Sequence, residues 1–92
     1  MKKLMTIEDI RDVPGKGVVV GGVNPTLDHL TAEDIEKKIG EYVEIRSSSP
    51  ETIKIFSVLD VKIAESIVGK KNIFILLSED FNMSRGAEVF FE

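Results

Sequence analysis

The sequence predicts a mainly β domain, a small closed six-stranded antiparallel β-barrel with one short helix near residues 32–39. Short apolar segments alternate with turn signals about every ten residues, which is typical of a small barrel or sandwich. Two segments, 18–20 and 73–77, are apolar on both faces, and barrel closure would cover those faces and remove free strand edges. A chain of 92 residues is expected to form one domain, residues 1–92.

The stretch Ile7–Val23 (IEDIRDVPGKGVVVGGV) is expected to organise the fold as a strand, a tight turn and a second strand. Pro14 fixes its own φ and favours an extended residue before it. Gly15 and Gly17 can adopt the positive φ values that tight turns require. We therefore predict a structural turn over residues 13–17.

The strand that follows this turn begins with three valines, residues 18–20, and is predicted to be central and covered on both sides. Gly21 and Gly22 predict a bulge or a sharp bend, as at a barrel corner. A phosphate-binding loop is not favoured. Three residues separate Gly17 from Gly21, neither Ser nor Thr follows Lys16, and no helix pattern comes next.

One helix is predicted, over residues 32–39. Thr31 is suited to cap its N-terminus, and Gly40 supplies a stop signal after its last turn. Ile35 and Ile39 are four residues apart and therefore share one helical face.

The remaining elements are predicted to be strands. A change of alternation around Ser57 predicts a bulge there, or a strand that crosses between sheet faces. The first strand alternates imperfectly, which favours an edge position. The predicted strands cover residues 4–11, 41–46, 53–63, 72–77 and 87–91.

Composition excludes several classes of protein. The apolar fraction of 42% and a mean hydropathy of +0.04 fit a folded globule, not a disordered chain. The sequence contains no cysteine, which excludes disulfides, thiol catalysis and cysteine-based zinc sites and suits a reducing cytoplasm. Glu8 and Asp9 precede any apolar region, so no signal peptide is expected. No apolar run approaches the roughly 20 residues of a membrane helix, so we expect a cytoplasmic protein without a membrane partner.

The charge distribution does not favour RNA as a partner. Net charge is −4, whereas nucleic-acid-binding domains usually carry a basic excess or a basic stripe. The lysines are scattered and are expected to be solvated surface. Six of them form three pairs, Lys2-Lys3, Lys37-Lys38 and Lys70-Lys71.

No catalytic residue, metal site or cofactor is predicted. His29 is the one histidine, and beside Asp28 it has neither a nucleophile nor a second metal ligand at helical spacing, so a surface loop is expected. Neighbouring carboxylates, such as Glu8-Asp9, point to opposite sides of a strand and do not form an acid–base pair there. Glu79-Asp80-Asn82 offers oxygen ligands for calcium without the spacing of an EF-hand.

The glycine-rich stretch resembles the start of domain 2 of translational GTPases of the elongation factor Tu type. The usual pattern there is I-x-D-V-F-x-I-P-G-R-G-T-V-V-T-G-R-V. Segments 39–45, 67–77 and 85–89 are similar to later parts of that domain, so the resemblance covers nearly the whole chain. It implies a translation-protein-type β-barrel. The positions that match or are conservatively replaced are Ile7, Asp9, Ile10, Val13, Pro14, Gly15, Gly17, Val19, Gly21 and Val23.

The same resemblance suggests where a binding surface would lie. In elongation factors this domain helps to hold the aminoacyl end of tRNA against a GTPase domain, for which this chain has no counterpart. Glu8 and Asp9 match an acidic pair of the family, and Asn72 matches a family asparagine. However, Asp60 stands where the family has a basic residue, and Phe74 stands where it has a glycine.

We therefore expect a non-catalytic binding module whose partner is a protein or a ribonucleoprotein, in or near the translation machinery. The alternative is a structural, homo-oligomerising domain in which Val89–Phe91 and Leu4-Met5 pair across a symmetry axis by edge addition. A small enzyme is a third hypothesis, and it is not favoured. The candidate binding surface comprises Glu8, Asp9, Lys16, Lys70, Lys71 and Asn72, and the structural turn comprises Pro14, Gly15, Gly17 and Gly21.

Overall fold

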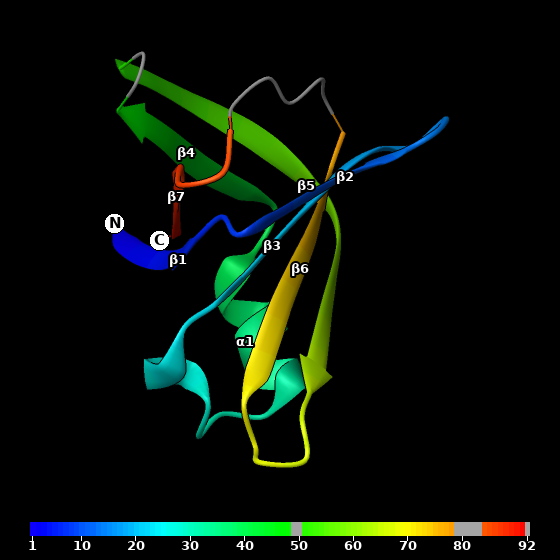
Figure 1. The fold of residues 1–92 in the computed structure, drawn as a ribbon, viewed down its shortest axis with the longest axis vertical. Helices are drawn as coiled ribbons and strands as arrows, with labels where there is room; N and C mark the ends of the chain where they lie inside the picture. The colour runs from blue at the N-terminus through cyan, green and yellow to red at the C-terminus, as the bar shows by residue number, and fades with distance from the viewer. Residues whose placement is uncertain (49–50, 79–83, 92) are drawn as a thin grey trace.

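A computed structural model describes residues 1–48, 51–78 and 84–91 of the chain. Strands dominate these residues, and one α-helix and one short 3-10 helix, η1, lie between the third and fourth strands (Figure 1). In chain order the elements are β1 (Lys2–Thr6), β2 (Asp9–Val13), β3 (Gly17–Val23), η1 (Pro25–Leu27), α1 (Ala32–Ile39), β4 (Tyr42–Ser48), β5 (Glu51–Glu65), β6 (Lys71–Leu77) and β7 (Glu88–Phe91).

The described strands form one antiparallel sheet of seven strands in the order β1-β7-β4-β5-β6-β3-β2. The sheet is curled and open, so the predicted closed six-stranded barrel is wrong in both strand number and closure. The mainly β class and the single short α-helix are confirmed.

The extra strand arises because the predicted strand 4–11 divides in two. At the division, Ile7 N donates to Ala87 O at 2.8 Å, while Glu8 N donates to Gly21 O at 2.8 Å. The chain therefore leaves β7 and joins β3 within two residues. As a result β1 and β2, although consecutive in sequence, occupy opposite ends of the strand order.

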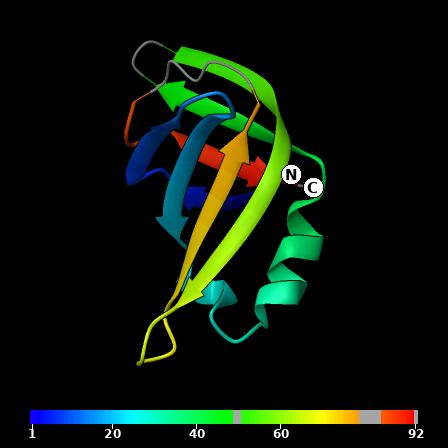
Figure 2. The same ribbon diagram turned by 90° about the vertical axis from the view of Figure 1, so that its right-hand side faces the viewer.

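The long strand β5 joins the two halves of the sheet and produces its curl (Figure 2). Residues 51–57 pair with β4, and residues 58–65 pair with β6. The register against β6 shifts between Val58 and Asp60, which leaves Leu59 as an extra, bulged residue. The bulge predicted near Ser57 is thus confirmed, two residues further along the chain.

The core lies on the inner side of the curl. Phe56, at the point where β5 changes partners, is fully buried, and α1 contributes Ile35 and Ile39 from the same inner side (Figures 1 and 2). The other buried apolar residues come from five of the strands and the segments that flank them: Leu4, Met5, Ile7, Val18, Val20, Val43, Ile45, Ile73, Ile75, Leu77, Ala87, Val89 and Phe91.

Helix α1 begins and ends where the sequence predicts. Thr31 Oγ1 accepts a hydrogen bond from Asp34 N at 3.1 Å, which satisfies a free N-terminal amide. Gly40 follows the last turn with a φ of 72°. Among the described residues, no helix combines the length and the apolar character needed to cross a bilayer.

The predicted turn is present, and it fixes how β3 lies against β6. Lys16 N donates to Val13 O at 3.0 Å, and Gly15 has a φ of 78°. Gly17 has a φ of 147°, and a Cβ at this position would collide with the carbonyl oxygen of Leu77. A side chain at Gly17 would therefore force β3 away from β6.

Of the predicted bulge or sharp bend at Gly21 and Gly22, the bulge is wrong, because β3 keeps a continuous register with β6 through both residues and with β2 as far as Gly21. The two glycines allow close approach instead. A Cβ on Gly22 would collide with the carbonyl oxygen of Thr6, and a Cβ on Gly21 would lie 2.9 Å from the ring of Phe74.

Two further expectations about strand positions need correction. The strands over 18–20 and 73–77 are central, but only their inner faces are fully buried, and Val19, Phe74 and Leu76 on the outer face are half-buried. Strand β7 has a hydrogen-bonded neighbour on each side, β1 and β4. It therefore offers no edge for pairing with a second copy, and Val89 and Phe91 belong to the core.

Candidate functional site

The outer side of β2, β3, β6 and the second half of β5 carries a hollow of about 430 Å³. We call this surface the hollowed face. Its residues come from four neighbouring strands and from the β2–β3 turn, and they combine apolar side chains with side chains of both charges. They are Asp9, Arg11, Val13, Lys16, Val19, Asp60, Lys62, Phe74 and Leu76.

The strand registers place eight residues of this surface in two rows across the four strands. Taken across the sheet from β2 through β3 and β6 to β5, the first row is Asp9, Gly21, Phe74 and Lys62. The second row, in the same order, is Arg11, Val19, Leu76 and Asp60. The uncharged residues occupy the two middle strands, and the charged residues occupy the two outer strands. Each row begins and ends with opposite charges, and the order of the charges reverses from one row to the next.

The floor of the hollow is formed by Val19, Phe74 and Leu76, all half-buried. The Phe74 ring lies across Gly21 on the neighbouring strand, where a Cβ would come within 2.9 Å of two ring carbons. Gly21 thus allows the ring to lie against the sheet. The result is an apolar strip two strands wide that remains partly open to solvent.

The charges beside this strip have no ion-pair partner in the part of the chain that the structure describes. Among the described ion pairs none includes Asp9, Arg11, Lys16, Asp60 or Lys62. The charges on β2 and β5 are separated by three strand spacings, about 14 Å, which is too far for contact across the strip. One carboxylate has a local role, because Asp60 Oδ1 accepts a hydrogen bond from Val61 N at 2.9 Å.

The other half of the sheet has a contrasting outer surface, which we call the paired face. It lies on β1, β7, β4 and the first half of β5. Lys3 Nζ lies 2.8 Å from Glu88 Oε2, and Arg46 Nε lies 2.5 Å from Glu44 Oε2. The Arg46 guanidinium also lies 4.1 Å from the centre of the Phe90 ring. Four charges on the paired face, those of Lys3, Glu44, Arg46 and Glu88, are therefore neutralised by their own neighbours.

The structure brings together only two of the six residues predicted to form a binding surface. Asp9 and Lys16 line the hollow. Glu8 is exposed where the chain passes from β1 to β2, and Lys70 is exposed between β5 and β6. Asn72 is half-buried and pairs with Val23, two residues along the strands from the Gly21–Phe74 pair of the first row.

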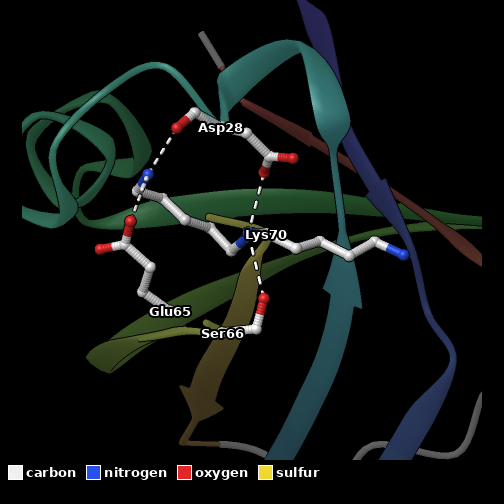
Figure 3. Close-up of polar contacts among 5 residues, drawn as sticks. Asp28, Glu65, Ser66 and Lys70 are labelled. Atoms are coloured by element: carbon white, nitrogen blue, oxygen red, sulfur yellow. Dashed lines mark hydrogen bonds and ion pairs between the residues drawn. The ribbon is translucent and has the colours of Figure 1, made fainter. Parts of the chain in front are cut away.

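Lys71 is buried and has a structural role, which differs from the expected solvated surface. Its backbone N donates to Asp28 Oδ1 at 3.1 Å, and its Nζ donates to the Asp28 carbonyl oxygen. Glu65 Oε1 lies 3.6 Å from the same Nζ, and Lys70 N donates to Ser66 Oγ at 3.1 Å. Figure 3 shows these contacts, which fasten the β5–β6 connection to the segment before α1.

Sequence reasoning did not assign seven residues of the hollow to a binding surface: Arg11, Val13, Val19, Asp60, Lys62, Phe74 and Leu76. The sequence contains part of the information needed to find this surface, since the alternation of side chains along a strand places Asp9, Arg11 and Val13 on one side of β2. The other part was the strand order, because only adjacency of β2, β3, β6 and β5 gathers these side chains.

No group of three or more His, Asp or Glu side chains among the described residues could hold a metal ion. His29 is exposed, and the carboxylate beside it, on Asp28, accepts the Lys71 hydrogen bond. Glu79-Asp80-Asn82, which offers oxygen ligands without the spacing of an EF-hand, lies outside the described residues.

Comparison of the chain with family models, with curated proteins and with solved structures finds no match.

Proposed function

We propose that this domain is a non-catalytic binding module of the elongation-factor domain 2 type, and that it contacts its partner through the hollowed face. The observation that carries the proposal is the partly open apolar strip of Val19, Phe74 and Leu76, flanked by charges that have no ion-pair partner among residues 1–48, 51–78 and 84–91. Apolar area that the fold leaves half-covered, with charges available at its rim, is the composition of a protein-binding surface.

The charge pattern favours protein over nucleic acid as the partner. The hollow is lined by three cations, Arg11, Lys16 and Lys62, and by two anions, Asp9 and Asp60. Phosphate backbones are bound by basic stripes, and carboxylates among the cations repel them. A partner that displays both charges matches this surface better. With a ribonucleoprotein, we expect contact through its protein component.

The sequence resemblance supports a place in or near the translation machinery, and the departures from it define the limits of the proposal. Phe74 fills space that the family leaves open at a glycine, and Asp60 reverses the charge of a basic family position. Both residues lie in the hollow. We therefore do not transfer the binding of the aminoacyl end of tRNA, and we assign the surface a protein ligand instead.

Co-sedimentation with ribosomes and tRNA from a lysate of the source cells, at low and at high salt, tests this function. We expect any retention to be lost in Phe74→Ala, because the substitution removes most of the apolar floor. Lys37→Glu, on the exposed side of α1, is the matched surface control. Retention that falls steeply with salt and survives Phe74→Ala would indicate a phosphate contact and would contradict the proposal.

A further inference from the structure

We propose that the protein partner of the hollowed face is a second copy of this chain, packed face to face about a two-fold axis. This inference rests on the proposed function, because it uses the same surface, and it adds the identity of the partner. It is carried by the placement of four charges: Asp9 and Arg11 on β2, and Asp60 and Lys62 on β5.

These four residues occupy the corners of a rectangle. The strand registers put Asp9 and Lys62 at the two ends of one row, and Arg11 and Asp60 at the two ends of the next. From strand geometry, the corners are about 14 Å apart across the strands and about 7 Å apart along them. Like charges therefore lie on the diagonals, and opposite charges lie along every side.

A pattern of this kind is complementary to itself. With a two-fold axis parallel to the strands, Asp9 of one copy faces Lys62 of the other, and Arg11 faces Asp60. With the axis across the strands, Asp9 faces Arg11, and Asp60 faces Lys62. Either orientation forms four intersubunit pairs of opposite charge, because each pair occurs twice in a symmetric dimer.

The apolar strip lies between the charges in both orientations and would be covered by the strip of the second copy. Face-to-face sheets pack about 10 Å apart, with strand directions within about 30° of each other. Arginine and lysine side chains are long enough to reach across such a gap at the rim. The face is small for a stable interface, so we expect a dissociation constant on the order of 0.1 mM.

Other exposed apolar surfaces support no comparable assignment. On the paired face, Tyr42, Ile53 and Ile55 are exposed, but the charges around them are neutralised within the chain. At the end of the β5–β6 connection, Ile67 and Val68 are almost fully exposed, and no complementary feature indicates what would cover them. Among the surfaces that the described residues form, the hollowed face is the one whose charge pattern specifies its own partner.

Sedimentation velocity of the purified chain from about 10 µM to about 2 mM tests the dimer. We expect a reversible monomer–dimer equilibrium that Lys62→Glu weakens about tenfold or more, because the substitution turns two attractive contacts per dimer into repulsive ones. Arg11→Glu is a second variant with the same expected effect. Lys37→Glu makes the same change in net charge on α1 and should leave the equilibrium unchanged. Circular dichroism shows that each variant is folded.

Two double variants identify the axis. Lys62→Glu with Asp9→Lys restores association if the axis is parallel to the strands, and Arg11→Glu with Asp9→Lys restores it if the axis runs across them. Rescue by either one supports the proposal. Rescue by neither, an equal effect of Lys37→Glu, or a monomer at every concentration overturns it. A monomer that still loses ribosome co-sedimentation on Phe74→Ala would refute the dimer and leave the proposed function standing.

Discussion

The two outer faces of the sheet carry similar types of side chain, but their charged side chains are arranged differently. Each spans four strands and carries charges of both signs beside large apolar side chains. On the paired face the charges lie on neighbouring positions, where Lys3 meets Glu88 and Glu44 meets Arg46. On the hollowed face two apolar strands separate β2 from β5, and the charges find no partner among the described residues.

This difference shows that side-chain length and the side chains on the neighbouring strand decide whether a surface charge pairs within the fold or remains available to a partner. Glu44 and Arg46 are two residues apart on one strand, as are Asp9 and Arg11. Arg46 also lies over the Phe90 ring, which holds its guanidinium near Glu44. Asp9 is one methylene shorter than Glu44, and its neighbour across the sheet is Gly21, which offers no side chain.

The largest expected effect on the free energy of unfolding concerns the register of β3 against β6, the two middle strands of the hollowed face. Gly17→Ala should reduce the free energy of unfolding by about 3 kcal/mol, because its Cβ would collide with the Leu77 carbonyl oxygen in a strained backbone conformation. Gly15→Ala has open space around it and should cost about 1 kcal/mol. Urea unfolding followed by circular dichroism measures both. Equal losses would mean that the contact between β3 and β6 does not set the register.

A second comparison concerns the contribution to stability of a buried lysine and of its exposed neighbour. Lys71→Met should lower the free energy of unfolding by about 2 kcal/mol, because the Asp28 carbonyl oxygen loses its donor in a partly buried site. Lys70→Met, one residue earlier and exposed, should change it by less than about 0.5 kcal/mol. Thermal unfolding of the two variants makes the comparison. A neutral Lys71→Met would remove the structural role assigned here.

The two half-buried outer phenylalanines separate stability from association. Phe74→Ala and Phe90→Ala should each cost about 1.5 kcal/mol in unfolding, since both lose half-buried apolar area. Only Phe74→Ala should weaken self-association, because Phe74 lies in the hollow and Phe90 lies beneath Arg46. Chemical denaturation and sedimentation of the same samples give the two quantities. Weaker association in both variants would break the distinction between the faces.

The smallest expected effect compares one carboxylate from each face. Glu44→Gln should cost about 1 kcal/mol, because the carboxylate is largely buried and holds Arg46. Asp9→Asn should change the free energy of unfolding by less than about 0.5 kcal/mol, because Asp9 is exposed and in no described ion pair. Urea titrations at low and high salt should show the larger, salt-sensitive effect only for Glu44→Gln.

Features encoded by short-range sequence were predictable. The helix over residues 32–39 follows from the Thr31 cap, the buried pair Ile35 and Ile39, and the stop at Gly40. The turn at Pro14 follows from local backbone preferences, and the bulge in β5 follows from a break in alternation. Each of these depends on a few neighbouring residues.

Features that depend on strand pairing were not predictable. The division of the first strand is set by hydrogen bonds from Ile7 and Glu8 to two distant strands, which no local pattern signals. The same limit applies to the binding surface. Asp60 and Phe74 are 51 and 65 residues from Asp9 in sequence, and only the sheet order places them around one hollow.

The most direct test of the central claim is a dilution series of the isotope-labelled wild-type chain, followed by amide chemical shifts in NMR. We predict concentration-dependent shifts that cluster on the hollowed face, at residues such as Arg11, Val19 and Lys62. Amides of the paired face should stay unchanged. Shifts that cluster around Phe90 and Ile53 instead, or no shift up to millimolar concentration, would contradict the claim that the hollowed face is the surface through which this domain associates.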